Sequence, residues 1–234
     1  MSKRKPRGLT LVELMVTLLI AVILGALAYD ALQQSRPRAS LNETAAELMS
    51  AIHSARQSAL ANGTNFAVLL FPTYASSQGT GRFVVLEDEP VGDGNPSFFS
   101  TAAPLNFANY DPTALGATPN GGVITTFDLP PQVLVGPAVG MGFLLPFPYN
   151  AIPTNVDCSF CGAGGDRRGA IVFDDRGRAS FCSAPGPTTI SCTTVTAGQS
   201  FTLYETDLLS GATYTTQTLV ITAPQGVVRT FENG

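Results

Sequence analysis

The feature that most constrains this chain is an apolar run from Leu9 to Tyr29 that carries a carboxylate, Glu13, near its start. As an α-helix these 21 residues would be about 31 Å long, at about 1.5 Å per residue, enough to cross a bilayer. A carboxylate in hydrocarbon costs about 2.5–3.5 kcal/mol on insertion scales, so we expect Glu13 to need a partner. A basic flank favours a cytoplasmic N-terminus, and such a flank precedes the run: Lys3, Arg4, Lys5 and Arg7.

Three interpretations of this segment are open. A secretory signal peptide would use Ala26-Leu27-Ala28 as its cleavage site, but it should not contain Glu13 in its apolar stretch. A plain membrane anchor explains the length and leaves the carboxylate unpaired. In the third interpretation the chain is cut after Gly8 and the helix is retained. Leu9 then carries a new amine, Glu13 is the fifth residue of the mature chain, and Thr10 caps the helix or shares the hydrogen bonding.

The third interpretation agrees with a known family. The stretch "RGLTLVELMVTLLIAVILGAL" closely resembles the leader of type IV pilins and pseudopilins: a basic stretch, Gly, a hydrophobic residue, and Glu at position five. Leu9 stands where that family usually has Phe. The resemblance implies that a prepilin peptidase removes residues 1–8 and methylates the Leu9 amine. It also implies that the amine of a neighbouring subunit pairs with Glu13, and that the partners are other pilins and an inner-membrane assembly platform.

The helix is expected to continue beyond the membrane. Residues 9–35 form the transmembrane and assembly segment, and residues 36–62 form an amphipathic continuation. Apolar residues in the continuation recur at steps of four and three, which is typical of a helix with one buried stripe: positions 41, 45, 48, 52, 55 and 59. Pro37 is expected to interrupt and kink the helix, and Asn62-Gly63 is expected to end it.

Residues 63–234 predict a periplasmic β body. Only 13 % of the chain is charged, and 23 Gly and 17 Pro indicate many turns. The expected strands lie within residues 65–71, 82–87, 122–129, 131–135, 169–182, 199–207 and 213–231, with turns at 174–177 and 224–226. Two long loops, 87–122 and 136–168, separate them. The fold class is therefore α+β, a long helix packed on antiparallel sheets.

The body also resembles a particular group of pilins. The stretch "AAELMSAIHSARQSALANGTNFAVLL" resembles the GspH/FimT group of pseudopilins and minor pilins, which ends its helix in a pattern matched here by Ala55, Arg56, Ala59 and Gly63. "AIVFDDRGRASF" is similar to a hairpin of that group, and "TLVITAPQGVVRTF" to its closing strand. The resemblance implies a structural subunit of a type IV pilus or type II secretion pseudopilus, without enzymatic activity or cofactor. It does not extend to residues 87–160.

The four cysteines, Cys158, Cys161, Cys182 and Cys192, all follow the membrane segment, and in an exported body an even number fits two disulfides. Three pairings are possible, and closure of local loops favours Cys158–Cys161 with Cys182–Cys192. A zinc site is the alternative. It is disfavoured because nine residues separate the second pair and the expected compartment is oxidising.

Other candidate sites have simpler explanations. His53 is the only histidine and stands beside no nucleophile motif, so a structural role is expected. Asp93, Asn95 and Ser97 have the alternate spacing of a calcium loop. Phe98 and Pro104 occupy the positions where such a loop needs a turn glycine and a bidentate glutamate. Neither catalysis nor a metal site is predicted.

Binding to DNA is the remaining alternative function within the pilin class. Some minor pilins of the resembling group bind DNA through a C-terminal G-R-x-R motif, which corresponds here to Gly226-Val227-Val228-Arg229 and lacks the first arginine. Residues 9–234 contain nine arginines and 17 acidic residues, a formal net charge of −8 that opposes phosphate binding. The other arginines cluster among aspartates, as paired surface charges: Arg167, Arg168, Arg176 and Arg178, with Asp166, Asp174 and Asp175. DNA is therefore not an expected partner. An exported β domain with a cleaved signal is the alternative outside the pilin class.

Overall fold

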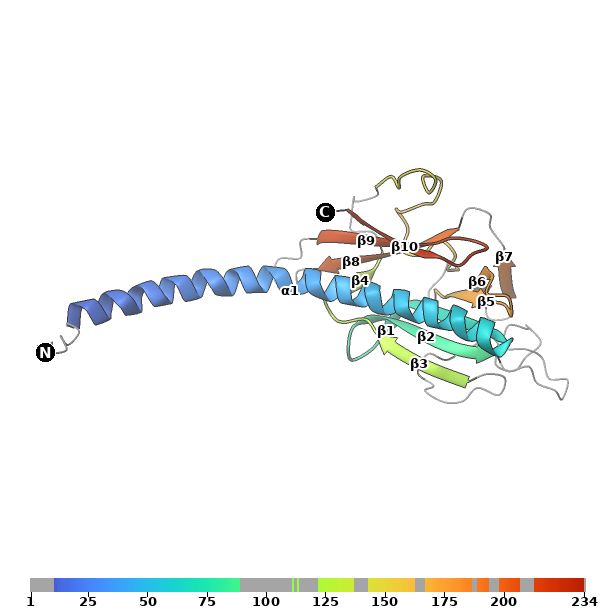
Figure 1. Cartoon of the computed structure of the whole chain (residues 1–234), viewed down its shortest axis with the longest axis horizontal. Helices are drawn as coiled ribbons and strands as arrows, with labels where there is room; N and C mark the ends of the chain where they lie inside the picture. The colour runs from blue at the N-terminus through green and yellow to red at the C-terminus, as the bar shows by residue number, and fades with distance from the viewer. Residues whose placement is uncertain are drawn as a thin grey trace, which may run out of the picture.

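The structure is a computed structural model that describes residues 11–88, 111, 113, 122–136, 143–162, 167–186, 189–193, 198–206 and 213–233. Within these ranges one helix, α1 (Leu11–Asn62), precedes ten strands (Figure 1). The strands are β1 (Asn65–Ala75), β2 (Thr80–Asp88), β3 (Gly122–Asp128), β4 (Val133–Val135), β5 (Gly169–Phe173), β6 (Ala179–Gly186), β7 (Thr189–Thr193), β8 (Gln199–Thr206), β9 (Thr213–Ile221) and β10 (Val228–Asn233). The α+β class expected from the sequence is confirmed.

Helix α1 has two halves with different surroundings. Its first half projects away from the strands, and its second half lies along them (Figure 1). The 52-residue helix is continuous across Pro37, so the expected interruption there is wrong. A proline removes one backbone hydrogen bond, and the bonds of the turns on either side are enough to continue the helix. Figure 1 shows only a gentle bend where α1 reaches the body.

The second half of α1 is held by the apolar stripe that its periodicity predicts. Every residue of the stripe is at most 3 % exposed and belongs to the main core: Leu41, Ala45, Leu48, Ile52, Ala55 and Ala59. Three of the six are alanines, which allow the strands to approach the helix axis closely. Gly63 adopts a φ of +66° directly after the helix, as expected for a left-handed C-terminal residue.

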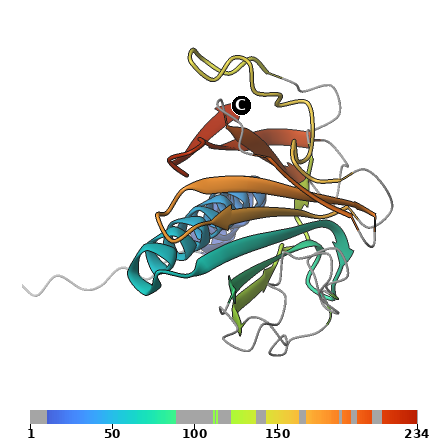
Figure 2. The same ribbon diagram turned by 90° about the vertical axis from the view of Figure 1, so that its right-hand side faces the viewer.

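The strands form two antiparallel sheets beside α1. One has the order β3-β2-β1-β5-β6-β7 and the other the order β10-β9-β8-β4. Figure 2 looks roughly along α1 and shows the helix next to both sheets. In β1, Phe66, Val68 and Leu70 face the core shared with α1, because successive side chains alternate between the faces. The intervening residues, Ala67, Leu69 and Phe71, form a second cluster on the opposite face.

Most expected strands are present, and the differences are local. Strand β7 was not predicted from the sequence, and it pairs with β6. Within the expected loop 136–168, residues 143–162 form turns and a single bridge between Cys158 and Phe201. The expected loop 87–122 lies almost wholly outside the described residues.

The end of α1 contacts the β5–β6 hairpin. Arg56 Nε donates a hydrogen bond of 3.2 Å to the carbonyl oxygen of Gly177. Gly177 has a φ of +67°, and a Cβ added there would lie 2.9 Å from Leu60 Cγ. The turn therefore requires glycine for its backbone conformation and for the close approach of the helix.

We expect Gly177→Ala to lower the free energy of unfolding by about 1–2 kcal/mol, because alanine is strained at positive φ and crowds Leu60. Urea titration of the detergent-solubilised chain measures this change. The same substitution in a Leu60→Ala background should cost less, because the steric part is relieved. An equal cost in both backgrounds would show that the contact with Leu60 contributes nothing.

Candidate functional site: the exposed half of α1

The first half of α1 is an apolar helix that the body does not cover. The span Leu11–Tyr29 has 19 residues, is long and apolar enough to cross a membrane, and is 0 % buried. Its large apolar side chains are between 49 % exposed, at Val16, and 76 % exposed, at Leu11. Length and apolarity would equally suit a signal sequence, so these two properties alone do not distinguish the interpretations.

The exposed apolar surface of this span is unfavourable in water. Apolar area contributes about 25 cal/mol per Å² when it is removed from water, and large apolar side chains occur along the whole span. They are Leu11, Val12, Leu14, Met15, Val16, Leu18, Leu19, Ile20, Val22, Ile23, Leu24, Leu27 and Tyr29. The span is therefore suited to surroundings of lipid or other apolar helices.

The polar residues of the exposed half are few. Glu13 lies in the first turn of α1, where the positive end of the helix dipole favours a carboxylate. Thr17 donates its hydroxyl hydrogen to the Leu14 carbonyl oxygen at 3.0 Å, so its polar group is satisfied within the helix. The expected cleavage site at Gly8 and Leu9, and Thr10, lie outside the described residues.

Polar contacts fasten α1 to the second sheet near the point where the helix enters the body. Arg38 forms an ion pair with Glu232 of β10 at 2.6 Å. One turn further along α1, the Gln217 side-chain amide of β9 donates a hydrogen bond to the Asn42 side-chain oxygen. These contacts hold the helix where its exposed half begins.

Glu205 of β8 is a carboxylate buried on the face of the sheet that packs on α1. It is 4 % exposed, and its Oε2 atom has no hydrogen-bond partner in the part of the chain that the structure describes. Burial raises the pKa of Glu205 above its usual value of 4.5, and the charge of Glu232 acts in the same direction. A hydrogen bond from Thr215 and the charge of Arg38 oppose this rise.

We expect Glu205→Gln to stabilise the body at neutral pH by about 1 kcal/mol, because it removes a buried carboxylate that is incompletely hydrogen-bonded. A raised pKa in the fold means that wild-type stability falls as pH rises from 4.5 through the folded-state pKa. Urea titrations across that range should show this slope in the wild type and a smaller slope in Glu205→Gln. Equal slopes in wild type and Glu205→Gln would contradict the assignment.

The four cysteines form two disulfides. Cys158 is bonded to Cys161, and Cys182 of β6 is bonded to Cys192 of β7. This is the pairing that local loop closure favoured. Because all four sulfur atoms are in disulfides, the thiolates required by the zinc alternative are not available. The candidate calcium residues Asp93, Asn95 and Ser97 lie outside the described residues.

The remaining candidates are spread over the body. His53 is half-buried on α1, and Arg229 lies on β10 with its Cζ atom 5.7 Å from the centre of the Tyr149 ring. Two arginines of the expected cluster pair with aspartates: Arg167 with Asp157, and Arg178 with Asp174 at 2.7 Å. Arg168 lies over the Phe71 ring, with its Cζ atom 5.4 Å from the ring centre. The structure does not bring these residues together into one site.

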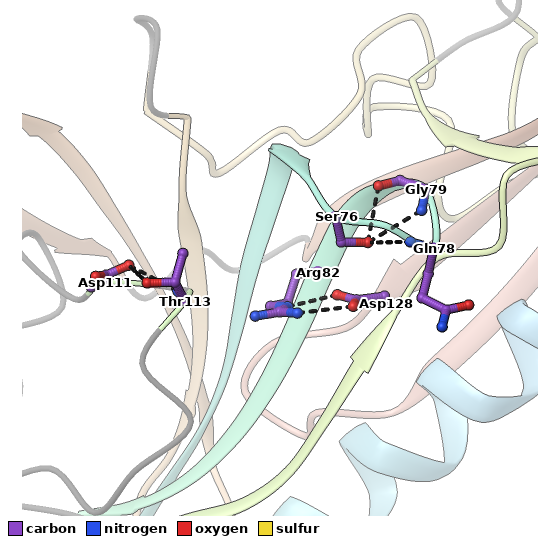
Figure 3. A network of polar contacts seen from close by, with 7 residues as sticks. All are labelled: Ser76, Gln78, Gly79, Arg82, Asp111, Thr113 and Asp128. Atoms are coloured by element: carbon purple, nitrogen blue, oxygen red, sulfur yellow. Dashed lines mark hydrogen bonds and ion pairs between the residues drawn. The ribbon is translucent and has the colours of Figure 1, made fainter.

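Sequence reasoning missed a polar network at the β2–β3 edge (Figure 3). Arg82 binds Asp128 through two hydrogen bonds of 2.6 and 2.8 Å, and its Cζ atom lies 4.4 Å from the centre of the Tyr74 ring. The hydrogen bond from Arg82 lowers the pKa of Asp128. Nearby, Ser76 Oγ accepts hydrogen bonds from two backbone N–H groups in the turn that follows it. Figure 3 also shows a separate hydrogen-bonded contact between Asp111 and Thr113. The sequence signal that could have indicated this network is the arginine in the otherwise apolar stretch "RFVVL".

An α+β body with a projecting, membrane-compatible apolar helix is the architecture expected of a membrane-anchored pilin. Residues 3–29 match the prokaryotic N-terminal methylation motif, which covers most of the leader and the exposed half of α1. That motif supports a type IV pilin-like protein, a substrate of prepilin peptidase. No curated protein and no solved structure matches the chain.

Proposed function

We propose that the chain is a structural minor pilin or pseudopilin, incorporated into a type IV pilus or a type II secretion pseudopilus. The observation that carries the proposal is the uncovered apolar span Leu11–Tyr29, which bears Glu13 in its first turn and lies within the matched methylation motif. A helix of this kind needs lipid before assembly and other helices after it.

The steps follow from the chemistry of this helix. Prepilin peptidase cuts after Gly8 on the cytoplasmic side of the inner membrane and methylates the Leu9 amine. The helix stays in the membrane with the body in the periplasm, where the two disulfides are stable. On assembly the helices leave lipid and pack against one another. The Glu13 carboxylate of one subunit then meets the amine of its neighbour, which fixes the axial stagger.

Packing within the body supports assignment to the GspH/FimT group. The three segments that resemble that group meet at one end of the structure. Arg56 at the helix end binds Gly177 of the hairpin, and the Ala179 backbone N–H donates to the Pro224 carbonyl oxygen of the closing turn at 2.9 Å. A Cβ added at Gly226 would lie 2.6 Å from the Phe173 ring, so this turn is closely packed on the hairpin.

The mature N-terminus tests the proposal most directly. Mass spectrometry of the chain purified from its own membranes should find Leu9 as the first residue, carrying one methyl group. A strain without prepilin peptidase should retain residues 1–8. A mature chain that begins at Tyr29 would instead identify an exported domain with a cleaved signal peptide.

A further inference from the structure

The outer face of the four-stranded sheet is crossed by a loop formed by residues 143–152. Val220 of β9 points away from α1, because its neighbours Leu219 and Ile221 belong to the main core. Leu145 and Ile152 of the loop pack on Val220 and are 3 % and 6 % exposed. The loop is therefore anchored to the sheet by its own apolar residues.

The same loop displays two large apolar side chains to solvent. Leu144 is 90 % exposed and Phe147 is 89 % exposed. Three hydrogen bonds fix the intervening backbone: Tyr149 N–H to the Pro146 carbonyl at 2.8 Å, Ile152 N–H to the Tyr149 carbonyl at 2.9 Å, and the Thr154 hydroxyl to the Phe143 carbonyl. Burial of such a side chain contributes about 1.5–3 kcal/mol, and ordering of this loop on binding costs little because it is already held.

A hollow of about 370 Å³ lies beside this loop. It is lined by Pro148, Tyr149, Thr222, Ala223, Gln225, Val227 and Arg229. The Tyr149 ring is supported by the Phe231 ring, with ring centres 5.5 Å apart, and the Arg229 guanidinium lies over Tyr149. The tilted ring pair supports the face of Tyr149 over which the cation lies, at the wall of the hollow.

Arg229 lacks the ion pair that four of the described arginines form. Arg38, Arg82, Arg167 and Arg178 each form an ion pair with a carboxylate. Arg229 forms none with the residues that the structure describes. Residues 9–234 carry a formal charge of −8, so within the described residues this arginine is a local positive charge on an acidic body.

We propose that Leu144, Phe147 and the hollow at Arg229 form a docking surface for another protein subunit, which presents an apolar side chain next to an Asp or Glu carboxylate. Exposed apolar side chains on a loop that also lines a hollow with one cation are complementary to that combination. A nucleic acid would use Arg229 but leave both apolar side chains uncovered and meet an acidic body. The identity of the partner as a neighbouring subunit of the same filament rests on the proposed function; the docking surface itself does not.

A photo-cross-linker tests the surface in the full-length chain in its own cells. With p-benzoylphenylalanine in place of Phe147, we expect a cross-link to a pilin-like subunit at a peptide that contains Asp or Glu. Arg229→Glu should lower the yield about 10-fold or more, and Arg229→Lys should retain most of it. Replacement of the partner's carboxylate by Lys should restore the yield in the Arg229→Glu strain. The same probe at Ile124, which is 54 % exposed on β3, is the control that Arg229→Glu should not affect.

The outcomes separate this proposal from the proposed function. Cross-links that nuclease removes, or a yield that does not depend on Arg229, would overturn the docking surface. No cross-link in a chain that is cut after Gly8 and recovered in filaments would also overturn it, and the proposed function would stand. An Arg229-dependent cross-link to an acidic protein from an uncut chain would support the surface and overturn its assignment to a filament neighbour.

Discussion

Glu13→Ala is expected to leave cleavage after Gly8 intact and to reduce incorporation into filaments by about 100-fold or more. Four residues, 9–12, lie between the peptide bond that is cut and Glu13, so the substitution does not alter that bond. In the assembled helices, however, the amine of the neighbouring subunit would remain in an apolar environment without its carboxylate. Removal of one partner of a buried ion pair costs about 3–5 kcal/mol, and each 1.4 kcal/mol is a factor of ten in an equilibrium constant.

The measurement is the ratio of the chain in sheared filaments to the chain in membranes, with the mature N-terminus determined in both fractions. Glu43→Ala is the matched control, because Glu43 is an exposed glutamate on the body half of the same helix. It should be incorporated normally. Normal incorporation of Glu13→Ala would show that the charge pair is dispensable, whereas failure of cleavage would show that Glu13 acts at the processing step.

The parts of the fold that sequence predicts well are those that local periodicity specifies. The apolar stripe from Leu41 to Ala59 follows helical spacing, so it lies on one face of the helix, and that face must pack against the core. The disulfide pairing can be predicted from the sequence for a similar reason, because Cys158–Cys161 and Cys182–Cys192 each close a short loop. Strands β1 and β2 contain apolar runs that follow glycine residues, so local propensity also identifies them.

The parts that sequence does not predict depend on pairs of residues distant in the chain. Three of the five residues of β7 are Thr or Ser, and the segment forms a strand because β6 lies beside it, joined by Cys182–Cys192. The alternation of β8 places Glu205 on the core face, but its burial depends on where α1 crosses. The loop formed by residues 143–152 likewise depends on contacts with residues distant in the chain. Nothing local distinguishes Leu145, which is buried, from Leu144, which is exposed.

The Arg82–Asp128 pair is the contact of this long-range kind with the largest expected effect on stability. The two side chains are 9 % and 15 % exposed and join β2 to the edge strand β3. We expect Arg82→Met to lower the free energy of unfolding by about 3 kcal/mol, because it leaves the Asp128 carboxylate nearly buried without its cation. Arg178→Met is the matched control. It breaks a pair whose side chains are 58 % and 27 % exposed, and it should cost less than about 1 kcal/mol.

The pH dependence of the Arg82→Met effect distinguishes loss of the ion pair from loss of packing. Arg82 lowers the pKa of Asp128 below its usual value of 3.8, so the pair stabilises the fold above that pH. This stabilisation is lost as pH falls through the folded-state pKa. The difference between wild type and Arg82→Met in urea titrations should therefore be largest near neutral pH and shrink on acidification below about pH 4. A difference that stays constant with pH would mean that the Arg82 side chain stabilises the β2–β3 edge by its contact with Tyr74, and that its ion pair with Asp128 contributes nothing.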